Sequence, residues 1–174
     1  QGGKPVITLH SVKVNGDCAL RIRDEANVTL ILDGENSMCS KKSNCVYVED
    51  NSYLTITSIQ GDGSSAGTLR AEGNKSGEIN HAGIRGGSIT VKGGTVIAKG
   101  EYEAAGIGKD AREQNTNFSI SIEGGTVEAD GGWGGAGIGS ASQAGGNVNI
   151  SISGGTVKAV GGQGSSGIGI GYNS

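Results

Sequence analysis

The stretch of sequence that decides the fold is SITVKGGTVIAKGEYEAAGIG, residues 88–108. It returns as FSISIEGGTVEADGGWGGAGIG at residues 118–139 and as VNISISGGTVKAVGGQGSSGIG at residues 148–169. The GGTV element recurs at steps of 31 and 30 residues, and the later motif Ala/Ser-Gly-Ile recurs at the same two steps. Two motifs that recur together indicate one repeated structural unit whose copies stack on each other.

Each copy contains three short apolar pairs with a spacing of two residues, which is typical of β-strands. One coil cannot bury its interior alone, so we expect equivalent strands of neighbouring coils to pair in parallel. The sequence therefore predicts an all-β fold, a right-handed parallel β-helix that forms a three-sided solenoid of about five or six coils. The predicted interior pairs of the first copy are Ile89 with Val91, Val96 with Ala98, and Ala105 with Ile107; in the last copy they include Ile152 and Ile168.

The chain before residue 88 contains weaker forms of the same pattern. GTLRAEG at 67–73 aligns with GTVIAKG at 94–100, and HAGI aligns with AAGI. We therefore predict one continuous domain, with less regular N-terminal coils at 1–53 and regular coils of about 30 residues at 54–174. The chain begins at Gln1 without a Met or a signal-type segment, so we expect it to be part of a larger multidomain protein.

Composition and charge argue against several classes of partner. The 14 basic and 17 acidic side chains give a formal net charge of −3 and form no basic stripe, which argues against nucleic acid. No apolar run is long enough to predict a membrane span. Alignment of the repeats also places Lys99 between Glu72 and Asp130, and Lys92 beside Glu123. Such cross-strand pairs stabilise a sheet by roughly 0.2–1 kcal/mol each.

The corner between the second and third sides contains the candidate ligand site. Tyr102 and Trp133 each lie three residues before the Ala of their Ala-Gly-Ile motif, and Gln163 occupies the same position in the last copy. Exposed aromatic rings at one corner are suited to stacking on a sugar ring, whereas the simpler interpretation is that they cover the corner and protect backbone hydrogen bonds. The carboxylates that could accept hydrogen bonds from sugar hydroxyls there are Glu101, Glu103 and Asp130.

Metal and cysteine chemistry have weaker signals. Calcium could be held by loop carboxylates such as Asp62 and Asp110, but the repeated GGxGxD motif is absent and no ligand set is assigned. Apart from that calcium hypothesis we expect no cofactor. Cys39 and Cys45 could close a short disulfide loop, or they could pack with Cys18 as free thiols. Without a CxxC pair, zinc is not predicted.

Catalysis is not predicted. Polysaccharide lyases and hydrolases on this fold need clustered carboxylates, or carboxylates with Arg and Lys, on neighbouring coils. Lys99 with Asp130 comes nearest, and its simpler interpretation is the charge column described above. A Ser-His-Asp or Cys-His arrangement was not found either.

The runs GGTVIAKG…AAGIG, GGTVEADGGWGGAGIG and GGTVKAVGGQGSSGIG resemble the glycine-rich β-helix repeats of large surface or secreted proteins of gut-type Gram-positive bacteria. The leader ITLHSVKV…CALRI…ANVTLILDGEN is similar to the region that precedes such repeats. This resemblance implies a pectate-lyase-like β-helix that is often labelled carbohydrate-binding or adhesive, and it transfers no binding residues. The charged loop KDAREQNTN, residues 109–117, departs from the repeat and is a further candidate for specificity.

These observations predict a non-catalytic, secreted or cell-surface bacterial module that binds a polysaccharide or host glycan through Tyr102, Trp133, Gln163 and the nearby carboxylates. The alternative is a structural stalk or an adhesin module that binds a host or cell-surface protein. A fragment of a polysaccharide lyase or hydrolase is the third alternative.

Overall fold

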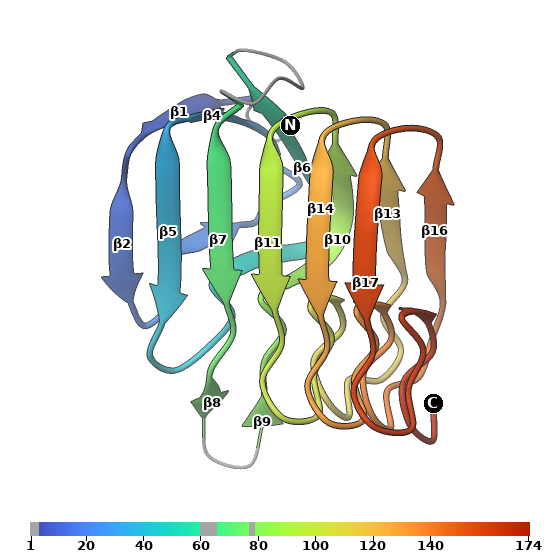
Figure 1. Ribbon diagram of the computed structural model, residues 1–174. Helices are drawn as coiled ribbons and strands as arrows, with labels where there is room; N and C mark the ends of the chain where they lie inside the picture. Colours follow the sequence, from blue (N-terminus) through green and yellow to red (C-terminus); the bar gives the residue numbers. More distant parts are fainter. Residues whose placement is uncertain (1–3, 60–65, 77–78) are drawn as a thin grey trace.

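The computed structural model describes residues 4–59, 66–76 and 79–174, and it shows a parallel β-helix (Figure 1). Within these ranges a ten-stranded sheet and a six-stranded sheet enclose the interior, a two-stranded hairpin lies apart from them, and no helix is present. No segment of the described chain therefore forms a helix that could span a membrane. The predicted fold class is confirmed.

The six-stranded sheet forms the second side of the solenoid and takes one strand from each coil. Its strands pair in parallel and follow the order of the chain, so each pass of the chain adds one strand to the same edge. They are β2 (Lys13–Gly16), β5 (Glu35–Ser40), β7 (Thr68–Glu72), β11 (Thr95–Lys99), β14 (Thr126–Asp130) and β17 (Thr156–Val160).

The ten-stranded sheet forms the first and third sides. Two of its strands, β6 (Val46–Ser58) and β10 (Ile84–Val91), run through both sides without interruption, where the sequence predicted two separate strands. Gly86 and Gly87, with φ of 99° and 43°, accommodate the bend in β10 because a side chain is disfavoured there. The other strands are β1 (Val6–His10), β3 (Leu20–Ile22), β4 (Asn27–Asp33), β12 (Ile107–Gly108), β13 (Phe118–Ile122), β15 (Ile138–Gly139), β16 (Val148–Ile152) and β18 (Ile168–Gly169).

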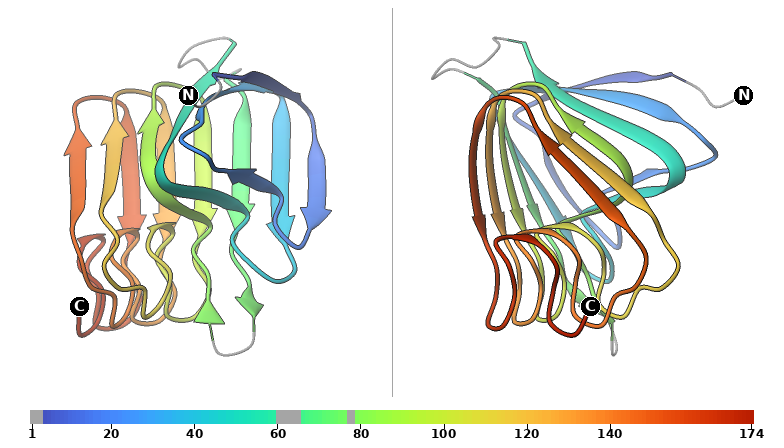
Figure 2. Two further views of the ribbon diagram at one scale, coloured as in Figure 1. Left: turned by 180° about the vertical axis from the view of Figure 1, so that it is seen from behind. Right: turned by 90° about the vertical axis from the view of Figure 1, so that its right-hand side faces the viewer.

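The hairpin of β8 (Lys75–Ser76) and β9 (Ile79–Asn80) extends from the third coil at the lower end in Figure 1. In the same view the second side runs downward in front and the chain returns upward behind it while advancing from the N-terminal to the C-terminal coil. This is a right-handed winding, as predicted. The right-hand view of Figure 2 looks along the solenoid from its C-terminal end and shows the coils lying one behind another.

The register confirms the alignments made from the sequence. Lys99 pairs with Glu72 on one side and with Asp130 on the other, and Ile84 of the HAGI motif pairs with Ile107. The expected pair across the first side also forms, with 3.5 Å between Lys92 Nζ and Glu123 Oε2. The repeat period therefore corresponds to one coil.

The core is a thin column of aliphatic side chains, as the scarcity of aromatic residues suggested. Ile89, Val96 and Ile107 are at most 1% exposed and represent the three sides of one coil. The prediction is wrong for Ile152 and Ile168, which are 44% and 45% exposed. Their strands lie at the edge of the sheet, so their inward faces are covered from one direction only.

Candidate functional site

The corner between the second and third sides is built by a turn that recurs in three coils. Backbone hydrogen bonds close it from Ala104 N–H to Glu101 C=O, from Gly135 to Gly132 and from Ser165 to Gly162. Tyr102, Trp133 and Gln163 each occupy the second position of their turn, where the side chain points away from the coil. The repeat thus brings these three residues into one exposed column.

Glycine decides the type of turn at this corner. Gly134 and Gly164 occupy the third position with φ of 80°, which fits a type II turn, and that turn requires a positive φ there. Glu103 holds the equivalent position in the preceding coil, and its φ is not positive. The first turn therefore has a different shape, which directs the Glu103 side chain elsewhere.

Aromatic stacking joins the members of the column. The rings of Tyr102 and Trp133 have centroids 5.4 Å apart and planes 10° apart, and the indole N–H of Trp133 donates to Gln163 Oε1 over 3.0 Å. Tyr172 adds a third ring, whose centroid lies 5.6 Å from that of Trp133 at an angle of 50°. We call Tyr102, Trp133, Tyr172 and Gln163 the aromatic corner.

Sequence reasoning missed Tyr172, although a signal for it exists. Tyr172 lies three residues after Gly169, the last residue of β18, and the same offset from Gly108 and Gly139 gives Ala111 and Ser142. The backbone N–H of Tyr172 donates to Gly134 C=O over 2.8 Å, which places the ring beside the corner of the preceding coil. Aligning positions 111, 142 and 172 of the three repeats would have identified the third ring.

The carboxylates proposed for the site are not brought together. Glu103 is 8% exposed, and its Oε2 accepts from Arg112 Nη2 over 3.2 Å and from Asn80 Nδ2 over 3.3 Å. Glu101 is half-buried and accepts from the N–H of Tyr102 over 3.2 Å, whereas Asp130 is exposed at the end of β14 beside Lys99. Glu101 is thus adjacent to the aromatic corner, and Glu103 is tied into a different network.

The stacked arrangement limits how a ligand can contact the rings. Tyr102, Trp133 and Tyr172 are 51%, 38% and 42% exposed, so each ring has solvent-accessible surface. The faces that Tyr102 and Trp133 turn toward each other are covered, which leaves ring edges and the outer faces. The corner therefore presents a continuous apolar strip along the solenoid axis rather than three separate platforms.

The charged loop at residues 109–117 is held to the solenoid by its own side chains. Lys109 is fully buried, and its Nζ donates to the carbonyl oxygens of Thr116 and Gly145 beside the ring of Phe118. Burial lowers the pKa of Lys109, since desolvation disfavours the ammonium form. This lysine connects two successive coils instead of facing a ligand.

A second buried charge in this region belongs to Arg85. Its guanidinium pairs with Glu113, and the two side chains are 9% and 11% exposed. It also lies 4.4 Å from the centre of the Tyr47 ring and 5.3 Å from that of Phe118. Arg21 lies 4.9 Å from the same Tyr47 ring, so a cation–π stack runs along the third side.

Asp110 has its oxygens occupied by neighbours as well. It accepts from the Ala82 N–H over 2.8 Å and from Asn44 Nδ2 over 2.6 Å, and its Oδ2 lies 3.0 Å from His81 Nδ1. Asp62, the other carboxylate considered for calcium, lies outside the described residues. In the part of the chain that is described, no three His, Cys, Asp or Glu side chains gather in a way that could hold a metal ion.

All three cysteines are free thiols, so the disulfide considered between Cys39 and Cys45 is not formed. Cys45 is buried and its thiol donates to the carbonyl of Glu72, while Cys18 and Cys39 are half-buried. Burial raises the pKa of Cys45 to about 12 and raises that of Cys18 as well.

Comparison with known proteins agrees with this architecture. The family model for a beta helix repeat matches residues 89–108, 120–142 and 150–171. These segments follow the strands of three successive coils, so this part of the chain is a β-helix repeat region. Neither the curated proteins nor the solved structures contain a match to the chain.

Proposed function

We propose that this protein is a non-catalytic carbohydrate-binding module of a secreted or surface-attached bacterial protein, and that its aromatic corner contacts a polysaccharide or a host glycan. The observation that carries the proposal is the contact series Tyr102–Trp133–Tyr172, which aligns exposed rings along successive coils. Sugar rings have apolar faces that pack on aromatic surfaces, and tyrosine and tryptophan supply both apolar area and polar atoms. A strip along the solenoid axis suits an extended chain of sugars.

The non-catalytic part of this proposal is supported by the buried carboxylates, which are already held in ion pairs and hydrogen bonds. Glu113 pairs with Arg85, Glu103 accepts from Arg112 and Asn80, and Asp110 accepts from a backbone N–H and Asn44. Carboxylates held by such partners serve as structural anchors and are poorly placed to exchange protons with a substrate. Binding through the aromatic corner needs no cofactor.

The test is a glycan array followed by calorimetry against plant and mucin polysaccharides. We expect Trp133→Ala to abolish measurable binding, because it removes the central ring of the strip. Tyr53→Ala is the matched control, since Tyr53 is 47% exposed on β6 and lies outside the aromatic corner. Unchanged binding by Trp133→Ala, or no binding by the intact protein to any glycan, would refute the proposal.

A rigid stalk or protein-binding adhesin is the second candidate, and tight stacking at the glycine corners favours it. A Cβ added to Gly135 or Gly162 would overlap backbone carbonyls of the preceding coil, so successive coils are in backbone contact. Such a stack resists bending and local opening. If the protein binds none of the glycans tested and strongly resists a general protease, the results support this candidate over the first.

A further inference from the structure

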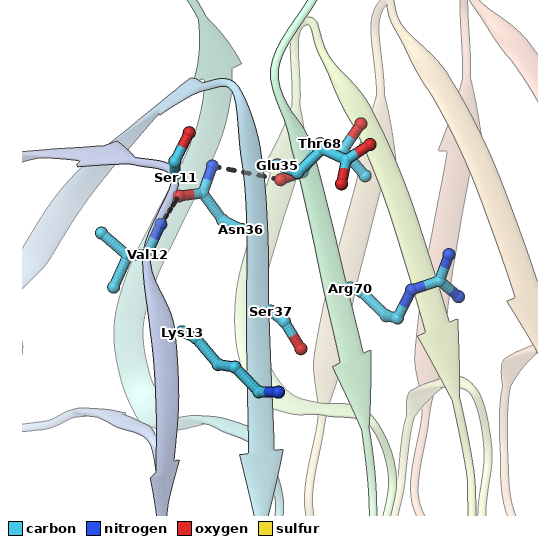
Figure 3. A pocket seen from close by; sticks show the side chains of 8 residues that line it. All are labelled: Ser11, Val12, Lys13, Glu35, Asn36, Ser37, Thr68 and Arg70. Carbon is cyan, nitrogen blue, oxygen red and sulfur yellow. Dashed lines mark hydrogen bonds between the residues drawn. The ribbon is translucent and has the colours of Figure 1, made fainter.

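A pocket of about 280 Å³ lies on the outer face of the second side, at its N-terminal end (Figure 3). It spans the first three strands of the six-stranded sheet, β2, β5 and β7, far along the chain from the aromatic corner. Its walls include outward-facing side chains of neighbouring coils, whereas Val12 packs against the core and Asn36 is buried. The lining residues are Ser11, Val12, Lys13, Glu35, Asn36, Ser37, Thr68 and Arg70.

The strand register places a hydroxyl between two cations in this pocket. Lys13 pairs with Ser37, and Ser37 pairs with Arg70, so the three form one row across the sheet. Adjacent strands lie about 4.8 Å apart, which puts the backbones of Lys13 and Arg70 roughly 10 Å apart with Ser37 midway. Figure 3 shows the three side chains on the same face.

The two cations have no anionic partner among the described residues, in contrast to Arg21, Arg85 and Arg112. Farther along the same row the pairing partners are Ile97, Glu128 and Lys158, so two neighbouring cations stand together only at the N-terminal end of the row, whereas Lys158 at the other end lies next to Glu128. Two unpaired cations beside a hydroxyl donor make a site suited to an anionic group.

The second row of the pocket has a different chemistry. Glu35 pairs with Thr68, two residues before Ser37 and Arg70 along their strands, and Ser11 also lines the pocket. Residues two apart along a strand lie roughly 6.6 Å apart, about the span of one sugar ring. A carboxylate and hydroxyls in this row can accept and donate hydrogen bonds to sugar hydroxyls.

The backbone beneath the pocket is held by one buried side chain. Asn36, which is 2% exposed, accepts from the Val12 N–H over 2.8 Å and donates to the Thr68 carbonyl over 3.1 Å. It thereby joins the first, second and third coils at the upper end of the pocket, as the dashed lines in Figure 3 show. A binding surface fixed in this way loses little conformational entropy when a ligand binds.

We propose that this pocket binds an acidic saccharide. The carboxylate or sulfate group of one sugar lies between Lys13 and Arg70 and accepts from Ser37, while a hydroxyl of the same sugar donates to Glu35. An acidic peptide fits less well, because its successive carboxylates would meet Glu35. This site is separate from the aromatic corner. It rests on the proposed function only in the assumption that the anionic group belongs to a saccharide.

The test compares binding of the intact protein to polygalacturonate, dextran sulfate, uncharged dextran and poly-L-glutamate by calorimetry. We expect binding to polygalacturonate, dextran sulfate or both, weakened by added salt because the contacts are between exposed charges. Binding to one polymer alone identifies whether carboxylate or sulfate is preferred. Arg70→Gln and Lys13→Gln should each weaken this binding about tenfold, since each removes a charge-assisted hydrogen bond.

Lys158→Gln is the matched control, because Lys158 is exposed in the same row at the other end of the sheet, outside the pocket. It should leave binding to the acidic polymers unchanged, and binding of a neutral glycan that is retained in Arg70→Gln would separate this site from the aromatic corner. Equal affinity for dextran and the acidic polymers, unaltered binding by Arg70→Gln, or tighter binding to poly-L-glutamate would each overturn the proposal.

Discussion

The indole of Trp133 lies nearly parallel to the ring of Tyr102, with 5.4 Å between the ring centroids, although 31 residues separate them in the chain. That separation is one repeat, so the contact forms only because one repeat makes one coil. Contacts between residues close in sequence could not bring the two rings together. The stacking of the two rings therefore depends on the register between neighbouring coils, and its loss would report a change in that register.

Removing this stack should cost stability as well as ligand binding. We expect Trp133→Ala to lower the free energy of unfolding by about 1–2 kcal/mol, because it removes an aromatic pair, the hydrogen bond to Gln163 and part of a partly buried surface. Urea denaturation followed by circular dichroism measures the change. Tyr53→Ala, at an exposed position with no ring contact among the described residues, should change it by less than about 0.5 kcal/mol; an equal loss in both variants would contradict the argument.

The ion pair between Arg85 and Glu113 should be worth far more than the one between Arg21 and Glu49. Glu113→Ala leaves a buried guanidinium without its partner and should destabilise the protein by about 3 kcal/mol. Glu49→Ala removes a partner from Arg21, which is 57% exposed, and should cost less than about 1 kcal/mol. Chemical denaturation at low and high salt measures both; a larger loss for Glu49→Ala would show that burial does not govern these pairs.

Two glycines at equivalent positions offer a matched test of coil stacking. Gly139 and Gly169 have φ of 135° and 130°, so alanine is strained at both. A Cβ on Gly139 would also overlap the carbonyl of Gly169, whereas a Cβ on Gly169 would meet nothing closer than the Ser166 Cβ at 3.6 Å. We expect Gly139→Ala to lower the melting temperature clearly more than Gly169→Ala in a thermal unfolding experiment. Similar losses would show that backbone strain alone accounts for the glycines.

The cysteines should differ in reactivity. With the pKa of Cys45 raised to about 12, only about 10⁻⁴ of this buried thiol is ionised at pH 8, and the thiolate is the nucleophile. We expect Cys39, which is half-buried, to react with a disulfide reagent in the native protein, and Cys45 to react only after unfolding. Mass spectrometry of peptides labelled at pH 8 distinguishes them, with Cys45→Ala as the control. Rapid native labelling of Cys45 would contradict this assignment.

The sequence predicted those residues of the candidate site that lie within the repeat motif. The common offset of Tyr102, Trp133 and Gln163 within their repeats was enough to place them in one column. Tyr172 was missed because it lies beyond the motif that defined the repeat. Glu103 was predicted to lie at the corner because it is adjacent to Tyr102 in the sequence. Its turn, however, directs the carboxylate toward Arg112 and Asn80.

The sequence by itself determined the coil, because a spacing of two between apolar residues and a step of 30 or 31 residues between copies leave one arrangement that buries every strand. It also determined which residues lie in one column, since the step sets the register. Only the tertiary structure decided which of those side chains find partners. Among the described residues Lys13 and Arg70 have no anionic partner, whereas Arg85 pairs with Glu113 and the buried Lys109 donates to two backbone carbonyls. The difference arises because contacts between coils depend on the shapes of corners and loops, which the repeat period does not specify.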